Sequence, residues 1–353
     1  MKKTFFLAIA IAFSVVLDAQ VNLTDDERFY SRHSDEIMQM FNEECPVLEI
    51  DTGEGQVFVY ALVDFDGDGK NELWVREIIG DNGAFFCRGG DSLAIIMATW
   101  FKSFASVNGN VLCAAGPAGT GAFFSSYSVL ENSAIAHYGS DLMIYNVETD
   151  TVDHECEYDG NEVSWSWFEN HFHSNKFVEP HNDEWLPFER LSSDVTMDKV
   201  SGTYYHQEYG EYNYFVIDLI TDGKGNAWFD AGLYSDSARL SEMRTFKWLP
   251  IENKTITFKD GDYELSIEMY GSCLYVKDLQ SKSDINYSGT YYRDFTTFGD
   301  NNGNLYMYDY DMEGALLISR GPNKGKVETP DKILFEYEGR EVPVVGVNEA
   351  VKK

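Results

Sequence analysis

The chain has 353 residues, with 59 acidic against 27 basic ones, a formal net charge of -32 and a pI near 4.4. A surface this acidic repels the phosphates of nucleic acids and anionic membranes, so nucleic-acid binding is excluded. Hydrophobic residues at 44% and aromatic residues at 15% exclude general disorder. The length predicts about two domains.

The N-terminus has the three parts of a secretory signal peptide. Met1-Lys2-Lys3 is basic, residues 4–17 are apolar, and the small residue Ala19 stands before the expected cleavage. The apolar run is too short to span a membrane, and no later segment is apolar enough to do so. We therefore expect removal of residues 1–19, no membrane insertion, and export to a periplasmic, cell-surface or extracellular location.

The first domain is expected over residues 20–195, as a helix followed by antiparallel β structure. Thr24 and Glu27 are spaced as in a capping box, which predicts a helix over residues 22–44. Residues 56–63 are nearly all apolar and β-prone, which predicts a buried strand. An acidic loop follows this strand, and the chain then returns in a second strand.

Pairs of the Asn-Gly or Asp-Gly kind recur along the chain and predict hairpin turns. They are Asn82-Gly83, Asn108-Gly109, Asp159-Gly160, Asp222-Gly223, Asp260-Gly261 and Asn302-Gly303. One short helix interrupts this pattern, since Ser166 to Glu169 is a second capping-box pattern and Phe168 and Phe172 are four residues apart. The sequence thus predicts a mostly β protein with little helix.

The domain boundary is expected over residues 191–199, which are polar and lack a strand pattern. A second domain over residues 198–346, with a tail at 347–353, is predicted to be a small β-barrel or sandwich. Within it Ser201 to Tyr205 recurs as Ser288 to Tyr292. We interpret this echo as an early and a late strand of one barrel, whose closure removes exposed sheet edges.

The five cysteines leave two interpretations open. They are Cys45, Cys87, Cys113, Cys156 and Cys273. Export permits disulfides, but an odd number leaves at least one thiol unpaired within the chain. Cys87 and Cys113 lie in predicted neighbouring β segments, so either one bridge joins them or the cysteines are buried, inert thiols.

Residues 64–72 read Asp-Phe-Asp-Gly-Asp-Gly-Lys-Asn-Glu and are the best candidate for a functional site. Hard oxygen ligands at alternating positions, with a glycine for the sharp turn, suit Ca²⁺. The predicted ligands are the carboxylates of Asp64, Asp66, Asp68 and Glu72 and the backbone carbonyl of Lys70. Four carboxylates this close repel one another unless a cation neutralises them. The alternative is a plain acidic β turn without metal.

The loop is not an EF-hand, because Val75 stands where that motif needs a bidentate glutamate and because strands flank it. From Asp64 to Val75 it resembles the calcium loop of the integrin-type FG-GAP and VCBS repeat families, which place Asp-x-Asp-x-Asp-Gly-x-x-Asp/Glu between two strands. The resemblance implies a structural calcium ion. Those families repeat the loop once per propeller blade, whereas this chain has a single good copy.

Residues 198–295 are similar to the small lipocalin-like barrels of exported bacterial proteins. Gly202-Thr203-Tyr204 stands where that family carries Gly-x-Trp, with tyrosine in place of tryptophan. The resemblance implies a barrel whose mouth holds a small apolar ligand.

Other motifs give weaker evidence for a functional site. His171, His173 and His181 lie close in sequence, but the first two are two residues apart on a predicted helix and so point to different faces. Residues 116–121 are glycine-rich but lack the lysine of a phosphate loop, so we expect a turn or bulge there. No nucleophile motif is present and no carboxylate pair is singled out. The sequence predicts no catalytic residue.

We therefore expect an exported, calcium-binding β protein that acts as a non-catalytic binding or surface/envelope module. Its partner would be a glycan, a protein or a small apolar ligand, because tyrosines and tryptophans crowd both domains and exposed rings hold such ligands. The alternative is a secreted hydrolase acting on glycans or peptides. An Asp/Glu pair about 5–10 Å apart in an aromatic-lined cleft would favour the hydrolase.

Overall fold

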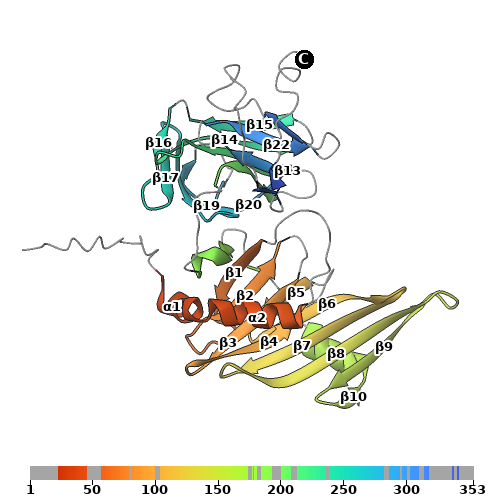
Figure 1. Cartoon of the computed structure of the whole chain (residues 1–353). Helices are drawn as coiled ribbons and strands as arrows, with labels where there is room; N and C mark the ends of the chain where they lie inside the picture. The colour runs from red at the N-terminus through yellow and green to blue at the C-terminus, as the bar shows by residue number, and fades with distance from the viewer. Residues whose placement is uncertain are drawn as a thin grey trace, which may run out of the picture.

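The computed structural model describes residues 23–45, 57–78, 82–99, 104–173, 177, 179–180, 184–192, 200–207, 213–235, 238–245, 247–281, 286–294, 296–299, 303–309, 314–317, 336–337 and 340–341. The protein is mostly β, as predicted, with antiparallel sheets and few helices. Its elements form two groups, one before and one after the segment 193–199 (Figure 1). That segment, which holds most of the predicted boundary, lies outside the described residues, as do the expected signal peptide and the tail at 347–353.

The N-terminal helix is broken into two. The predicted capping box starts α1 (Asp25–Arg32): the Glu27 N–H donates to Thr24 Oγ1, and the Thr24 N–H donates to the Glu27 carboxylate. The prediction of one continuous helix over residues 22–44 is wrong, because α1 ends at Arg32, α2 (Ser34–Glu44) begins at Ser34, and His33 between them is the cap of both helices. The His33 N–H bonds to the Tyr30 carbonyl, three residues back instead of four, which tightens the last turn of α1.

Both helices pack on one face of a five-stranded sheet, called sheet A here (Figure 1). Its order is β11 (Leu186–Pro187), β1 (Phe58–Val63), β2 (Glu72–Glu77), β3 (Gly83–Gly89) and β4 (Ser92–Ala98). The helices contribute buried residues at helical spacing, among them Phe29, Ile37 and Phe41. They lie in one buried cluster with Tyr60 and Val75 of the sheet, which buries the apolar stripe of each helix.

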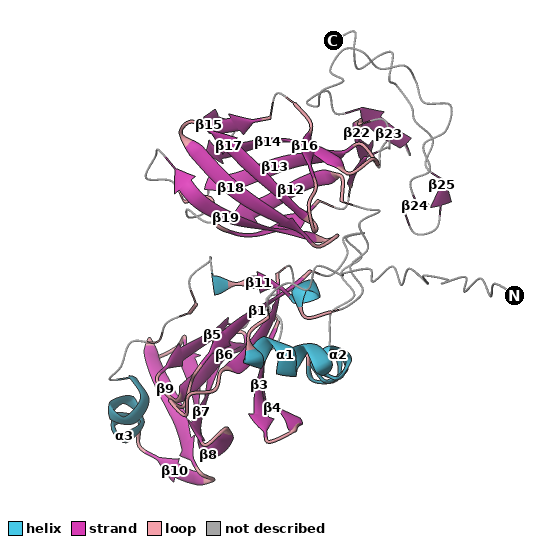
Figure 2. Cartoon of the chain, turned by 90° about the vertical axis from the view of Figure 1, so that its left-hand side faces the viewer, coloured by secondary structure: helices cyan, strands magenta, loops and turns pink. Residues whose placement is uncertain are grey.

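The second face of sheet A packs on a six-stranded meander, called sheet B. Its order is β5 (Phe104–Asn108), β6 (Val111–Gly119), β7 (Ala122–Glu131), β8 (Ala134–Asn146), β9 (Thr151–Tyr158) and β10 (Asn161–Val163). The strands nearest sheet A bury Ala105, Leu112 and Leu130 against Trp74 and Phe85. Both views place β9 and β10 at the end of sheet B far from α1 (Figures 1 and 2).

A short helix covers the other face of sheet B. It consists of α3 (Trp165–Phe168) and a five-residue π-helical turn, η1 (Glu169–His173). The predicted cap at Ser166 is wrong, because Ser164 caps α3 by accepting the Trp167 N–H. Gly139 of β8 lies beneath this helix, and a Cβ there would be 2.7 Å from the Phe172 ring. The glycine therefore permits close packing of helix on sheet.

The second group of elements forms a nearly closed, barrel-like sheet. It comprises β12 (Gly202–Gln207), β13 (Asn213–Thr221), β14 (Asn226–Ser235), β15 (Ala238–Arg244), β16 (Leu249–Pro250), β17 (Thr255–Asp260), β18 (Tyr263–Met269), β19 (Cys273–Ser281) and β20 (Gly289–Arg293). The strand order is β15-β14-β13-β12-β20-β19-β18-β17, with β16 paired to β14. Three short strands, β21 (Thr297–Gly299), β22 (Leu305–Asp309) and β23 (Gly314–Leu317), form a further sheet, and β24 (Glu336–Tyr337) pairs with β25 (Arg340–Glu341).

The sequence echo corresponds to an early and a late strand of the barrel-like sheet, as predicted, and the structure shows that the two strands are neighbours. The early strand β12 pairs with the late strand β20, in the register Tyr204 with Arg293. The echo extends to hydrogen bonding: the Tyr204 hydroxyl donates to the Val200 carbonyl at 2.6 Å, and the Tyr291 hydroxyl donates to the Tyr287 carbonyl at 3.0 Å. Each tyrosine thereby satisfies a buried carbonyl at the entrance of its own strand.

The two groups are joined by polar and apolar contacts. Arg190 of the 3₁₀ turn η3 (Phe188–Arg190) lies 3.1 Å from the carboxylate of Glu27 in α1 and 3.2 Å from that of Glu268 in β18. The Thr290 hydroxyl donates to the Trp185 carbonyl across the same junction. A buried charged group needs such partners, so this network specifies how the groups meet.

The structure also tests the predictions for the cysteines and for the hairpin turns. All five cysteines are free and buried, so the bridge between Cys87 and Cys113 does not form and the alternative of buried thiols holds. Asp159-Gly160, Asp222-Gly223 and Asp260-Gly261 connect paired strands as predicted. Asn302 lies outside the described residues.

Candidate metal centre

The acidic loop connects β1 and β2 and reverses the chain within a tight hairpin. Gly67 and Gly69 have φ values of +73° and +86°, a region that side chains with a Cβ rarely adopt. The two glycines therefore allow the backbone to fold back so that carboxylates from both ends of the loop meet.

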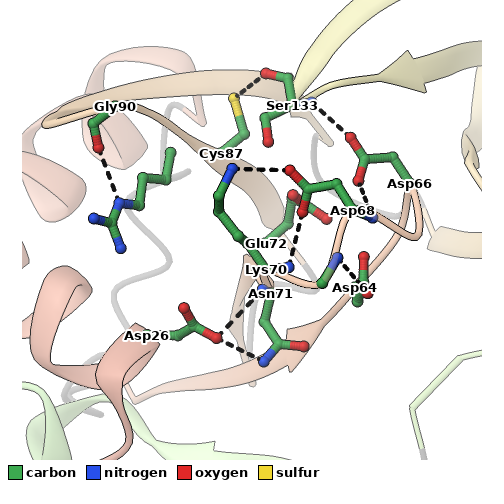
Figure 3. A network of polar contacts seen from close by, with 12 residues as sticks. Asp26, Asp64, Asp66, Asp68, Lys70, Asn71, Glu72, Cys87, Gly90 and Ser133 are labelled. Carbon is green, nitrogen blue, oxygen red and sulfur yellow. Dashed lines mark hydrogen bonds and ion pairs between the residues drawn. The ribbon is translucent and has the colours of Figure 1, made fainter.

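Three of the predicted ligands converge in this loop (Figure 3). Asp64, Asp66 and Glu72 each place one carboxylate oxygen within 4.8 Å of the other two. Asp64 is exposed, Asp66 is half-buried, and Glu72 has only 1% of its surface exposed. The group thus has a closed inner side and an open outer side, through which an ion and its waters can enter.

Backbone N–H groups hold each of these carboxylates in place. Gly69 donates to Asp64 at 3.1 Å, and Phe65 donates to Glu72 at 2.8 Å. Asp66 accepts the Asp68 N–H at 3.1 Å and, from outside the loop, the Ser133 N–H at 2.6 Å. Preformed positions lower the entropic cost of assembling a binding site.

Glu72 is the electrostatically strained member of the group. Burial raises the pKa of its carboxyl group to about 7, and the charges of Asp66 and Asp68 act in the same direction, while the Phe65 N–H opposes them. Its ionised form is therefore disfavoured without a neighbouring positive charge. A divalent cation between the three carboxylates would supply that charge.

Asp68 and Lys70 are arranged differently from the other three predicted ligands. The Asp68 carboxylate accepts the Lys70 N–H at 2.8 Å and lies 3.0 Å from Lys70 Nζ, and these hydrogen bonds lower its pKa. Asp68 therefore already has a positively charged partner. The structure brings together Asp64, Asp66 and Glu72 and leaves Asp68 paired with Lys70.

Contacts that the sequence did not predict attach the loop to two other parts of the fold, α1 and the β7–β8 turn (Figure 3). Asp26 of α1 accepts the side-chain N–H of Asn71 at 2.8 Å, and the Tyr30 hydroxyl donates to the Asn71 carbonyl. In the β7–β8 turn, the Ser133 N–H donates to the Asp66 carboxylate, and the Ser133 carbonyl accepts the thiol of Cys87 in β3. The loop residues and their partners in α1 and the β7–β8 turn are 41 to 67 residues apart in sequence, so no local pattern could reveal these contacts.

A second polar cluster, also unpredicted, lies on the helix-covered face of sheet B. The Cys156 thiol donates to Asp141 at 3.4 Å, and His154 Nδ1 lies 3.0 Å from the same carboxylate. Burial, together with the hydrogen bond to Asp141 and its charge, raises the pKa of Cys156 to about 12. The sulfur is therefore a protonated thiol and not a nucleophilic thiolate. The only sequence signal was His154-x-Cys156, which places both side chains on one face of a strand.

The remaining candidates do not assemble into a site within the described residues. There, the Asp64–Asp66–Glu72 group is the one set of three His, Cys, Asp or Glu side chains whose ligand atoms converge, and it includes neither His171 nor His173. His171 stacks on Trp167, with ring centroids 4.6 Å apart. His181 lies outside the described residues.

The interior of the barrel-like sheet is filled by its own side chains. Tyr204, Phe215, Tyr287 and Tyr291 belong to one buried cluster with the aliphatic residues of β13, β14, β17, β18 and β19. The predicted site for a small apolar ligand at the barrel mouth would thus lie above a packed core.

Comparison of the chain with protein-family models, with curated proteins and with solved structures found no match. Among the described residues, no helix has the length and apolar character needed to cross a membrane.

Proposed function

We propose that this chain is an exported, calcium-binding β protein that works by binding, as a surface or envelope module, and not by catalysis. The observation that carries the proposal is the convergence of Asp64, Asp66 and Glu72 in the β1–β2 hairpin. The acidic composition, the N-terminal sequence and the β-rich fold support it.

The geometry of the three carboxylates is compatible with a hard cation the size of calcium. Two oxygens bound to one Ca²⁺ at about 2.4 Å cannot be more than about 4.8 Å apart. The oxygens of Asp64, Asp66 and Glu72 satisfy this limit pairwise. Calcium takes six to eight oxygen ligands, so waters, backbone carbonyls or a reoriented Asp68 would complete the shell.

The role we propose for the ion is structural. The loop contacts α1 through Asp26 and the β7–β8 turn through Ser133. A cation that removes the repulsion between the carboxylates would stabilise these contacts together and would couple folding to ion concentration. Where calcium is plentiful outside the cell, the hairpin would keep its contacts with α1 and the β7–β8 turn.

The rival function, a secreted hydrolase acting on glycans or peptides, has less support. The cluster of Asp141, His154 and Cys156 contains residue types used in nucleophilic catalysis, but the raised pKa of Cys156 opposes that role. The carboxylates that converge in the hairpin have the mutual spacing of metal ligands.

Calorimetric titration of the metal-free protein with CaCl₂ tests the proposal. We expect one ion to bind the wild type and no measurable binding to the double variant Asp64→Asn, Asp66→Asn, which keeps side-chain size but removes two charges. The matched control is Asp222→Asn, which removes a carboxylate from another Asp-Gly-Lys hairpin and should leave calcium binding unchanged. Absence of binding to the wild type, or equal binding to the double variant, would contradict the proposal.

A further inference from the structure

The outer strand β9 of sheet B has an open edge. On one side β9 pairs with β8 along its whole length, from Thr151 to Tyr158. On the other side β10 pairs only with Cys156, Glu157 and Tyr158. Within the described part of the chain, residues 151–155 therefore have a strand neighbour on one side only. Unpaired backbone groups along such an edge can accept a further strand.

This edge lacks the features that usually block strand addition. The pairing of β8 with β9 is regular from Gly139–Tyr158 to Asn146–Thr151, without a bulge. Residues 151–155 contain neither proline nor lysine, and all except the half-buried His154 are exposed. Proteins commonly protect an edge with prolines, lysines or bulges. The open part of β9 is thus long and regular enough to pair with another chain.

The side chains along the open edge alternate between acidic and apolar or aromatic. Asp153, Glu155 and, beyond them, Glu157 share one face and are exposed. Val152, which is 47% exposed, points to the opposite face together with its cross-strand partner Tyr145, which is 43% exposed. Successive residues of a strand point to opposite faces, so a strand added here meets carboxylates at every second position and apolar groups between them.

The part of the chain that surrounds this edge contains no lysine or arginine. Residues 103–175, which include all of sheet B and its helix, contain ten aspartates and glutamates but no lysine or arginine. Glu157 of β9 even faces Glu162 of β10 in register, although like charges directly opposite destabilise a sheet. A complementary partner must therefore supply the positive charge.

We propose that the open edge of β9 binds an extended segment of a protein partner by strand addition, and that this segment alternates basic with apolar residues. Its lysines or arginines face Asp153 and Glu155, and its apolar side chains contact Val152. Antiparallel pairing of two copies of this chain through the edge is disfavoured because it sets acidic side chains against acidic side chains. The site shares no residue with the calcium loop, so it stands or falls independently of the proposed metal.

Binding of three synthetic peptides to the whole protein tests whether the partner pairs through its backbone. The first alternates lysine and valine over nine residues, the second has the same composition with its lysines grouped, and the third is the alternating peptide with every backbone nitrogen methylated. Measured by fluorescence anisotropy at about 0.15 M salt, the alternating peptide should bind at least about tenfold more tightly than either other peptide. Equal affinity for all three would show attraction by charge alone and would overturn strand addition.

Two charge-reversal variants test the location. Asp153→Lys with Glu155→Lys should weaken binding of the alternating peptide at least about tenfold, because attraction becomes repulsion along one face. The matched control, Glu252→Lys with Asp260→Lys, changes the net charge equally at exposed positions of the barrel-like sheet and should leave the affinity within about twofold. Equal loss in both variants would place the effect in net charge and contradict the proposal. A homodimer that the edge variant abolishes would also contradict it.

Discussion

Two hairpins of the molecule contain the sequence Asp-Gly-Lys, at residues 68–70 and 222–224. They differ in how well local hydrogen-bond donors satisfy the carboxylates of the turn. In the β13–β14 turn, Asp222 stands alone and accepts three hydrogen bonds, from the Lys224 N–H and from the backbone and side-chain N–H groups of Asn226. In the β1–β2 turn, three carboxylates converge and only some of their oxygens have donors. The number of carboxylates relative to local donors, and not the Asp-Gly-Lys sequence, distinguishes a self-contained turn from a candidate ion site.

The ionisation behaviour of the two turns follows from this difference. Desolvation opposes the charge of Asp222, but hydrogen bonds from Asn226 and Lys224 outweigh it and lower the pKa. In the other turn, burial and neighbouring negative charges outweigh the backbone N–H donors to Glu72 and raise its pKa. The first hairpin stabilises its own carboxylate, whereas the second requires a cation to do so.

The largest expected effect is stabilisation of one hairpin and not the other by calcium. At a free Ca²⁺ concentration about 100 times the Kd, binding to the folded state adds about 2.7 kcal/mol to the free energy of unfolding. Urea unfolding curves with CaCl₂ and with EDTA should differ by that amount for the wild type and for Asp222→Asn, but should coincide for Asp66→Asn. A calcium-dependent shift of the unfolding curve that persists in Asp66→Asn would contradict binding of the ion in the β1–β2 hairpin.

The second prediction concerns pH. Because the pKa of Glu72 is raised from 4.5 to about 7, the metal-free folded protein binds more protons than the unfolded chain between these values, and it loses stability as the pH rises through this window. Calcium needs the ionised carboxylate, so its stabilisation is present above about pH 7 and is lost as the pH falls below it, by up to about 1.4 kcal/mol per pH unit. Titration calorimetry at pH 6, 7 and 8 measures this loss, and an affinity independent of pH would exclude Glu72 as a ligand.

The third prediction concerns the self-contained turn. Asp222→Ala removes the acceptor of three hydrogen bonds and should lower the free energy of unfolding by about 1–2 kcal/mol. Since no ion is involved, the loss should be the same in CaCl₂ and in EDTA. A loss seen only in CaCl₂ would mean that the second hairpin also binds the ion.

The smallest expected effect distinguishes Asp68 from its neighbours. Asp68 is paired with Lys70 near the surface, and such exposed pairs contribute little, about 0–1 kcal/mol. Asp68→Asn should therefore change calcium affinity only a few-fold, whereas Asp64→Asn should abolish binding. If Asp68→Asn also abolishes binding, the Asp68 carboxylate must give up its pairing with Lys70 and bind the ion, as the spacing of the loop predicts.

Much of the fold was predictable because it follows from local patterns. Strand periodicity and Asp-Gly turns indicated antiparallel sheets, and the repeated segments at Ser201 and Ser288 indicated two strands of one barrel, which the structure pairs with each other. Local patterns were less reliable at helix ends, where His33 breaks the first helix and Ser164, not Ser166, caps the third. There a tertiary packing requirement competes with signals of similar strength a few residues apart.

The candidate site was predictable in its residue types but not in its grouping. Alternating aspartates indicated a calcium loop, yet the sequence could not tell that Lys70 holds Asp68 apart while Ser133 orients Asp66. Nor could it indicate Asp26, which belongs to another element and reaches the loop only after folding. These contacts depend on the packing of α1, sheet A and sheet B around the hairpin, which residue spacing does not encode.

The most direct test is a crystal structure of the protein grown in CaCl₂, with anomalous diffraction data collected at a wavelength sensitive to calcium. The account predicts one strong anomalous peak in the β1–β2 hairpin, about 2.3–2.6 Å from carboxylate oxygens of Asp64, Asp66 and Glu72, and none in the β13–β14 turn. A hairpin without a peak at saturating calcium, or a peak beside Asp222 instead, would contradict it.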